Sequence, residues 1–563
     1  MRLLPLKSAV RRLLTGVALT LAVSAPTLAG AQPAADAADS GIPIADEAVR
    51  QACGSCHRAD DQGRLSRISF RRTTPEGWQQ TIRRMVILNE VAITPEVARE
   101  VVRYLANNLG LAPEEAIPAA FEAERRTDDQ TYEDADVHQT CTTCHSMGRI
   151  MSQRRTGEEW QLVTAMHQGY YPFTDFQAFR RSGESDEPQP VDYAVTHLTE
   201  RFPLDSPEWS AWSATMRPPR IAGTWALTGH APGLGAVHGQ VTIAAVPGTD
   251  DEFTTQTRYV YARTGRQVER TGRAVVYTGF QWRGRSFEGA ADATAADPDG
   301  LREVMFVDRD WQAMRGRWFT GGYDEIGLDV ALSRVGAAPL VTGVYPAAVQ
   351  VGQTASLQLH GGNLAAAVAG DLDLGPGLEV LRLSSASPDL VTAEIRVGAD
   401  AAVGRRDLYL GQAALADALT VYDMVSRIAV TPDAGMARVG GVRVPKQFQQ
   451  FEARAFHDGP DGEAETDDDL DLGLVDVTWS VEEYATTFGD DDLRYVGAID
   501  DQGRFTPAED GPNVERSGNR NNVGDVWVVG TYAGSARTLR ARAHLLVTVP
   551  NYLRWDPTAV ERP

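Results

Sequence analysis

Two short stretches of this sequence decide how its first third folds: Cys53-Gly54-Ser55-Cys56-His57 and Cys141-Thr142-Thr143-Cys144-His145. They contain all four cysteines of the chain, and a histidine follows each pair at once. Two thiols three residues apart on a helical turn can form thioethers to the two vinyl groups of one haem, whose iron the next histidine binds. The stretches therefore predict two covalently bound haems of the c type.

Two other interpretations compete with haem. A redox dithiol is one, and a zinc site that pools both cysteine pairs is the other, because thiolates and imidazoles also suit zinc. Two copies of the motif in an exported chain without further cysteines favour haem, since c-type haem is attached in the periplasm. The zinc interpretation also leaves both histidines unexplained.

The start of the chain has the pattern of a secretory signal. Four basic residues precede an apolar run over 13–23, and Ala29-Gly30-Ala31 has the small residues of a cleavage site. The run is shorter than the ~20 residues that a membrane span needs. We therefore expect a signal peptide over 1–31, cleavage near Ala31, a periplasmic chain and no membrane span. The alternative is an amphipathic first helix of the folded protein.

Length, composition and charge exclude several classes of protein. A chain of 563 residues is long enough for several domains of ~100–200 residues each. Its 43% hydrophobic and 23% charged residues are ordinary for a soluble protein, which excludes wholesale disorder, collagen and a multi-span membrane protein. A formal charge of −22 argues against nucleic acid as a partner, because a phosphate backbone needs a cationic face.

The segments after the two haem motifs resemble each other, which indicates a duplicated unit. Arg71-Arg72-Thr73 corresponds to Arg154-Arg155-Thr156, and Trp78 corresponds to Trp160. We therefore expect the two haems to occupy two related helical units within 32–212.

The repeat also identifies candidates for the second iron ligand. Seven residues after the shared tryptophan, the first copy has Met85 and the second has His167, each in a helical pattern. Seven residues make about two turns, so each side chain lies on the tryptophan's face of its helix. We predict that His57 and Met85 bind the first iron, and that His145 and His167 bind the second.

Rival ligands are weaker. A helical methionine is usually core filler, which is the interpretation for Met147, Met151 and Met166. His197 corresponds to a position on the closing helix where the first unit has a tyrosine, so packing is favoured over ligation. His138 lies seven residues before His145 and is also a weak candidate. Because a methionine ligand raises a haem's potential relative to two imidazoles, electrons should pass from the second haem to the first.

The pattern changes to alternating strands and turns from about residue 217. Apolar or aromatic residues recur at about every second position over 223–228, 238–245, 273–282 and 316–331, which predicts an antiparallel barrel or sandwich over 213–336. Joints rich in glycine and proline divide the rest into 337–424 and 425–563. The opening strands of the first of these resemble immunoglobulin-like domains. Expected strands over 475–481 and 539–549 give the last unit the pattern of a sandwich too.

Other candidate sites are weak. The acidic loop around Asp461 offers oxygen atoms for calcium but lacks the regular spacing of a known calcium loop, so a solvated loop is favoured. The sequence has no nucleophile elbow, zinc-hydrolase helix, phosphate-binding glycine loop or dinucleotide fingerprint. We therefore expect no catalytic residue on this chain.

An exported dihaem domain with two unequal units, followed by three β domains, resembles the α (large, dihaem) subunit of quinohaemoprotein amine dehydrogenase. The resemblance covers essentially the whole mature chain, and its sharpest features are the two haem motifs and the Met85 and His167 pairing. It implies an oxidoreductase that oxidatively deaminates primary amines.

The resemblance also implies partners. The family is a heterotrimer: a small subunit carries a cysteine tryptophylquinone, a β-propeller subunit helps to enclose it, and this chain conducts the electrons to a soluble acceptor such as a blue-copper protein or a cytochrome c. All four cysteines here are assigned to haem, so none remains to build such a quinone on this chain. The alternative is a stand-alone exported dihaem cytochrome whose β domains serve another oxidoreductase.

Overall fold

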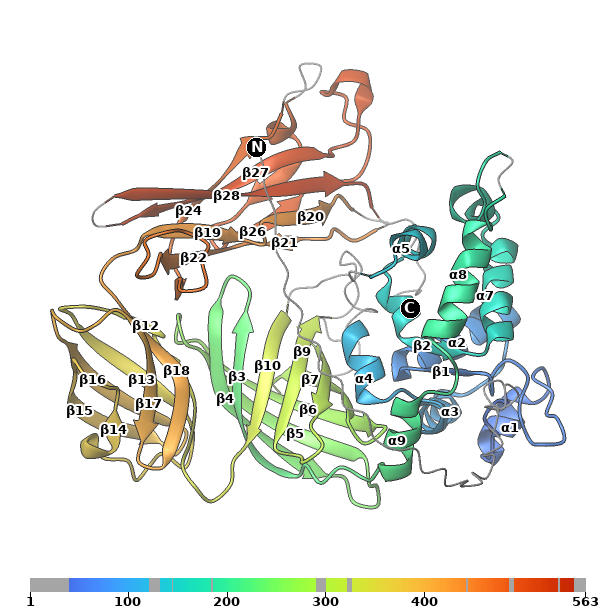
Figure 1. The fold of residues 1–563 in the computed structure, drawn as a ribbon, viewed down its shortest axis with the longest axis horizontal. Coiled ribbons are helices and arrows are strands. Elements are labelled where there is room, and N and C mark those ends of the chain that lie inside the picture. The colour runs from blue at the N-terminus through green and yellow to red at the C-terminus, as the bar shows by residue number, and fades with distance from the viewer. Residues whose placement is uncertain are drawn as a thin grey trace, which may run out of the picture.

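Helices precede strands along this chain, as the sequence predicts, and the β structure includes a closed barrel (Figure 1). The structure is a computed structural model, which describes residues 40–120, 132–143, 145–183, 186–289, 300–320, 327–441, 444–485, 491–534 and 537–550. The expected signal peptide over 1–31 and Cys144 lie outside the described residues.

The helical region has short helices with clear start signals. Thr74 accepts a hydrogen bond from the backbone N–H of Gly77 at 3.2 Å, and Pro75 follows it as the first helical residue. Thr156 likewise accepts from Glu159 N–H at 3.2 Å. The elements are α1 (Glu47–Cys53), β1 (Arg71–Thr73), α2 (Pro75–Asn89), α3 (Pro95–Asn108), α4 (Pro113–Ala116), α5 (Ala135–Thr142), α6 (Gly148–Met151), β2 (Gln153–Arg155), α7 (Gly157–Tyr170), α8 (Pro190–Arg201) and α9 (Pro207–Thr215).

The duplicated units are joined by a two-stranded antiparallel ladder of β1 and β2. Arg72 lies opposite Arg154 at its centre, and α2 and α7 leave its two ends. The units are thus related by a local two-fold axis. The sequence alignment of Arg71 with Arg154 was wrong by one residue: Arg72 and Arg154 are equivalent, because Thr74 and Thr156 both begin a helix two residues later.

The shared tryptophans occupy equivalent core positions. Trp78 is 1% exposed and its indole N–H donates to the carbonyl of Leu109 at 3.0 Å. Trp160 is 3% exposed and donates to the carbonyl of Phe202 at 3.3 Å. Each tryptophan therefore anchors the long helix of its unit to the end of that unit's closing helix.

The barrel is closed in the order β10-β3-β4-β5-β6-β7-β8-β9. Trp225, Trp282 and Trp318 fill its interior and are each 2% exposed or less, so it is a packed core. Its strands are β3 (Gly223–Ala231), β4 (Gly235–Ala245), β5 (Glu252–Tyr261), β6 (Gln267–Tyr277), β7 (Gln281–Glu288), β8 (Leu301–Val307), β9 (Ala313–Thr320) and β10 (Gly327–Arg334).

Two of the expected barrel strands were wrong in extent. The stretch 273–282 contains the end of β6, a turn at Thr278 to Phe280 and the start of β7, and 316–331 contains parts of β9 and β10. The alternation of apolar residues continues through a short turn when both flanking strands face the same core, so periodicity alone does not locate the turn.

Two further β units follow the barrel. We call the one over 340–422 the third unit and the one over 427–548 the fourth unit, because the helical region and the barrel precede them. The third unit has two four-stranded sheets that enclose one core. Its strands are β11 (Leu340–Tyr345), β12 (Ala348–Gln350), β13 (Thr354–Gly362), β14 (Leu372–Asp373), β15 (Leu378–Ser387), β16 (Leu390–Val397), β17 (Gly404–Leu410) and β18 (Ala413–Tyr422).

The fourth unit lies above the barrel and the third unit in Figure 1 and contains three sheets. Two of the expected strands overlap β24 and β28. Its strands are β19 (Arg427–Thr431), β20 (Ala434–Arg438), β21 (Gln449–Gln450), β22 (Glu452–His457), β23 (Leu470–Leu474), β24 (Thr478–Glu483), β25 (Gly497–Ile499), β26 (Arg504–Pro507), β27 (Gly524–Ala533) and β28 (Thr538–Thr548).

The barrel supports the helical region directly. Arg283 of β7 pairs with Glu76 at the start of α2. The backbone N–H of Thr278 donates to the amide oxygen of Asn107 at 2.7 Å, and the indole of Trp212 donates to the Thr278 carbonyl at 2.9 Å. These contacts fix α2, α3 and α9 against one edge of the barrel.

Candidate functional site

The second Cys-x-x-Cys-His motif and α7 bring two imidazoles close together. The ring centres of His145 and His167 lie 6.4 Å apart, with 55° between the ring planes. An imidazole nitrogen binds a transition metal at about 2.0 Å, so two imidazoles on opposite sides of one iron have ring centres roughly 6 Å apart. The separation of the two rings therefore fits an iron bound between them.

Hydrogen bonds orient both rings for this role. The Nδ1 of His145 lies 3.0 Å from the Ser146 carbonyl, and the Nδ1 of His167 lies 2.7 Å from the Val163 carbonyl. A carbonyl only accepts, so each Nδ1 carries the proton and Nε2 is the nitrogen with a lone pair for a metal.

The surroundings of His167 favour the neutral ring that a metal ligand must be. Burial lowers the pKa of His167 below its ordinary value. The hydrogen bond to Val163 acts in the opposite direction, and the charges of Arg84, Arg155 and Arg149 lower the pKa further. The imidazole therefore stays unprotonated near neutral pH.

Burial makes two of the cysteines, Cys53 and Cys141, poorly suited to redox chemistry. Burial raises the pKa of Cys141 to about 12 and raises that of Cys53 as well. A redox dithiol requires a thiolate, which such burial disfavours. Cys56 is exposed, and the partner of Cys141 in its motif, Cys144, lies outside the described residues.

The first motif also has an oriented histidine ring. The Nδ1 of His57 lies 2.8 Å from the Ser66 carbonyl, which orients this ring as in the second unit. Met85 is half-buried on α2, and its sulfur accepts a hydrogen bond from the Asn89 amide at 3.6 Å.

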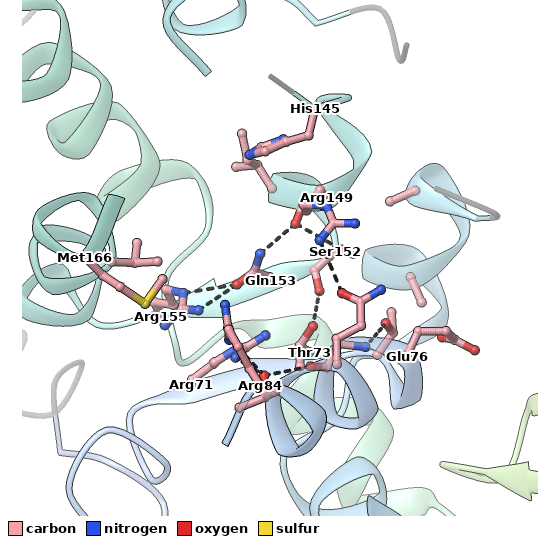
Figure 2. Close-up of a pocket in the computed structure, with 18 of the residues that line it drawn as sticks. Arg71, Thr73, Glu76, Arg84, His145, Arg149, Ser152, Gln153, Arg155 and Met166 are labelled. Carbon is pink, nitrogen blue, oxygen red and sulfur yellow. Dashed lines mark hydrogen bonds between the residues drawn. The ribbon is translucent and has the colours of Figure 1, made fainter. Parts of the chain in front are cut away.

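The rival ligands have other surroundings. Met147 is buried and packs with Met151 in the core of the second unit. The Nε2 of His197 lies 2.7 Å from the Tyr132 hydroxyl, so this half-buried ring has a polar partner of its own. His138 is half-buried on α5. Met166 differs, because it lines the same cavity as His167 (Figure 2).

A cavity of about 1280 Å³, its open mouth included, lies between α2, α7 and the edge of the barrel. Both His145 and His167 line it, together with side chains from both units and from β7 and β8. It is basic: its lining includes Arg71, Arg84, Arg149, Arg155 and Arg283. Among the described lining residues Glu76 is the single carboxylate, and Arg283 already pairs with it.

Sequence reasoning missed one residue of this region, Glu115. Its carboxylate lies at the local two-fold axis and pairs with Arg72 at 2.8 Å and with Arg154 at 3.0 Å. Burial by itself raises the pKa of Glu115, but the hydrogen bond and charge of Arg72 and the charge of Arg154 outweigh it and lower the pKa to about 2. The doubled arginines of the repeat were the only signal in the sequence.

The acidic loop near Asp461 has internal partners. Arg427 pairs with Asp458 at 3.0 Å and with Asp469, and Asp468 accepts a hydrogen bond from the Thr466 hydroxyl at 2.7 Å. Among the described residues, no three histidine, cysteine or acidic side chains group in a way that could hold a metal ion. Nor does any described helix have the length and apolar character to cross a membrane.

Four family models match the chain in succession. The matched descriptions are quinohemoprotein amine dehydrogenase A, alpha subunit, haem binding (residues 44–209), and quinohemoprotein amine dehydrogenase, alpha subunit, domain II (218–335), domain III (338–423) and domain IV (428–560). No curated protein matches.

The similar solved structures are similar only in part. A redesigned β barrel is 15% identical, covers 21% of this chain and 92% of its own, and has a TM-score of 0.16. The EC1-3 region of a mouse clustered protocadherin is 12% identical, covers 44% and 85%, and has a TM-score of 0.16. A Bacteroides ovatus protein of a mixed-linkage glucan utilization locus is 12% identical, covers 46% and 59%, and has a TM-score of 0.18.

Proposed function

Because this chain belongs to the quinohemoprotein amine dehydrogenase alpha-subunit family, and is thus part of an oxidoreductase, we propose that it is the electron-transfer subunit of a periplasmic amine dehydrogenase. The observation that carries the proposal is the 6.4 Å separation of the His145 and His167 rings beside a cavity. When bound there, haem accepts and releases single electrons.

The chain's own residues would hold two haems. Cys53 and Cys56 attach the first through thioethers, with His57 and Met85 as iron ligands. For the second haem, Cys141 and Cys144 form the thioethers, and His145 and His167 are the ligands. The backbone carbonyls of Ser146 and Val163 accept from the Nδ1 atoms of the second pair of rings, which would orient both imidazoles toward the iron.

The domain scheme that goes with this function is a dihaem cytochrome c domain over 32–212, a barrel over 213–336, and immunoglobulin-like sandwiches over 337–424 and 425–563. We assign the β units to the assembly rather than to chemistry. The quinone that oxidises primary amines is a cysteine tryptophylquinone on a small partner subunit, and a β-propeller subunit completes the heterotrimer. Electrons leave through a soluble acceptor.

Purification from the native periplasm tests this function. The tagged chain should carry two covalent haems, should bring a quinone-bearing chain and a propeller with it, and should show haem reduction when a primary amine is added without oxygen. A matched complex with His167→Ala should keep its covalent haems but lose the rapid reduction. A chain that purifies alone, with haems that no amine reduces, would contradict the proposal and favour a stand-alone cytochrome.

A further inference from the structure

Two guanidinium groups of the first unit lie together at the cavity that holds His145 and His167. Arg71 Nη1 donates to the Thr81 hydroxyl at 2.7 Å, and Arg84 Nη2 donates to the same oxygen at 3.4 Å. The Thr81 hydroxyl donates its own proton to the Gly77 carbonyl, so it serves both arginines only as an acceptor. One hydroxyl thus holds two cationic groups side by side.

The second unit adds a third guanidinium from the opposite side. Arg155 lies opposite Arg71 in the β1 and β2 ladder, and its guanidinium is held by the amide oxygen of Gln153 at 2.7 Å. The aromatic faces of Trp78 and Trp160 lie under Arg71 and Arg155, at 5.2 and 5.5 Å. In Figure 2 Arg71, Arg84 and Arg155 gather toward one end of the cavity, and His145 lies at the other.

Among the residues that the structure describes, the positive charge here exceeds the nearby negative charge. Glu159 is the carboxylate beside this group, and it is shared between Arg155 at 3.3 Å and Arg67 at 2.7 Å. Burial, followed by the charges of Arg155 and Arg84, lowers the pKa of Arg71 well below its ordinary value. Like charges placed together away from water are costly, and they are normally compensated by an anion.

Resting on the proposed function, we propose that Arg84 and Arg155, backed by Arg71, bind the propionate carboxylates of the second haem. The site is lined by the two predicted iron ligands of that haem, so the carboxylates of the same molecule come within reach of the arginines. A guanidinium presents a planar fork of donors that matches a carboxylate. The same chemistry would also bind a free anion such as phosphate, which the experiment must separate.

With Arg84 bound to a propionate of the second haem and Met85 bound to the first iron, α2 would contact both haems. Arg84 is adjacent in the chain to Met85, the predicted ligand of the first iron, while the Arg84 guanidinium lines the cavity of the second. A cation near a haem favours the reduced form, which carries one more negative charge. Arg84 and Arg155 should therefore raise the potential of the second haem and narrow the difference from the first.

Arg84→Gln in the full chain, matured with haem in the periplasm, tests the proposal. Spectroelectrochemical titration should show a roughly tenfold lower ratio of reduced to oxidised second haem at a fixed applied potential, or ~59 mV for this one-electron couple. The first haem should shift less. Arg84→Lys keeps the charge without the fork and should shift the second haem by a smaller amount. The control is Arg99→Gln, because Arg99 is on the surface of α3 and is 71% exposed.

The outcomes distinguish a failure of the proposed function from a failure of the propionate site alone. A parent chain without a bis-imidazole haem would overturn the proposed function. A parent with that haem, and an Arg84→Gln variant that titrates like Arg99→Gln, would overturn only the propionate site. Equal shifts of both haems would also overturn it, because they would indicate a general structural effect.

Two further arms complete the test. If added phosphate shifts the parent's second haem and the shift is lost in Arg84→Gln, the site binds a free anion and the propionate assignment is wrong. If phosphate leaves the potential of the parent's second haem unchanged, the propionate assignment is supported. If Arg84→Gln does not mature with two haems, the Arg84→Lys shift decides the question, and its absence overturns the proposal.

Discussion

The two duplicated units share a framework but differ in the side chain that each offers as the predicted second iron ligand. In both, a capping threonine starts the long helix, and a buried tryptophan stands seven residues before the candidate ligand. The second unit holds His145 and His167 with ring centres 6.4 Å apart, whereas Met85 of the first contacts Asn89. The two units therefore share a scaffold and differ at the position on the long helix where we predict the second ligand.

The largest expected effect comes from breaking one attachment site at a time. Cys141→Ser should remove the second haem and leave the first, because one thioether is lost from a haem that fills part of the unit's core. Cys53→Ser is the matched change in the first unit. Mass spectrometry of the denatured chains should show one haem in each variant, and two intact haems in either would contradict the thioether assignment for that unit.

A change at the two-fold axis should weaken both units together. Glu115→Gln leaves Arg72 and Arg154 without their shared carboxylate, which should cost about 3–5 kcal/mol of unfolding free energy. Urea unfolding, followed by haem absorption, measures the loss. Glu96→Gln is the control, since its ion pair with Arg99 on the surface of α3 is exposed to water and should add little to stability. Loss of only one unit would show that the axis does not couple them.

The lowered pKa of Glu115 predicts that the free energy of unfolding decreases in acid. The folded pKa of Glu115 is about 2, below its ordinary value of 4.5, so its contribution is complete above pH 4.5 and is lost as the pH falls toward 2. In Glu115→Gln this part of the acid transition should be absent. If the parent and Glu115→Gln lose stability identically between pH 4.5 and 2, the ion pairs of Glu115 do not hold the units together.

Exchanging the ligand should make the second unit resemble the first. His167→Met should raise the potential of the second haem by on the order of 100 mV, a fraction of the range of about 0.8 V that axial ligands span. Stopped-flow reduction of the assembled complex should then show a smaller or inverted difference between the haems. If the His57 haem reduces first in the parent, the proposed order of transfer is wrong, although the ligands could still be correct.

The smallest expected effect concerns a pair of stacked histidines outside the two duplicated units. His238 of β4 and His360 of β13 stack with ring centres 4.2 Å apart where the barrel meets the third unit, and both are buried. Burial lowers the pKa of His238 to about 3 and that of His360 to about 4. Both rings are therefore neutral in the folded protein.

Protonation of these rings accompanies loss of this junction. A histidine whose folded pKa is lowered contributes stability above its ordinary pKa of 6.5, which is lost as the pH falls toward 4. His360→Phe keeps an aromatic face without a titrating group, so it should reduce the loss between pH 6.5 and 4 by on the order of 1–2 kcal/mol. Tryptophan fluorescence during urea unfolding measures the free energy of unfolding at each pH. If this free energy depends on pH as strongly in the variant as in the parent, the prediction is wrong.

Local spacing determined much of the candidate site. The Cys-x-x-Cys-His motifs, the tryptophans and the helical positions of Met85 and His167 depend only on residues within a few helical turns, so the sequence alone suffices to predict them. The order of helices before strands, and the presence of β structure from the barrel onward, also followed from periodicity. The turn between β6 and β7 did not, because the alternation of apolar residues passes through it unbroken.

The tertiary structure alone decided how the two units meet. Glu115 pairs with Arg72 and Arg154 from elements 43 residues before it and 39 residues after it, and Arg84 of the first unit lines the cavity of the second. The register of the repeat was likewise set by the pairing of Arg72 with Arg154 across the ladder. Such contacts depend on where the chain returns after long connections, and buried charges choose partners by that geometry, which no local pattern of residues encodes.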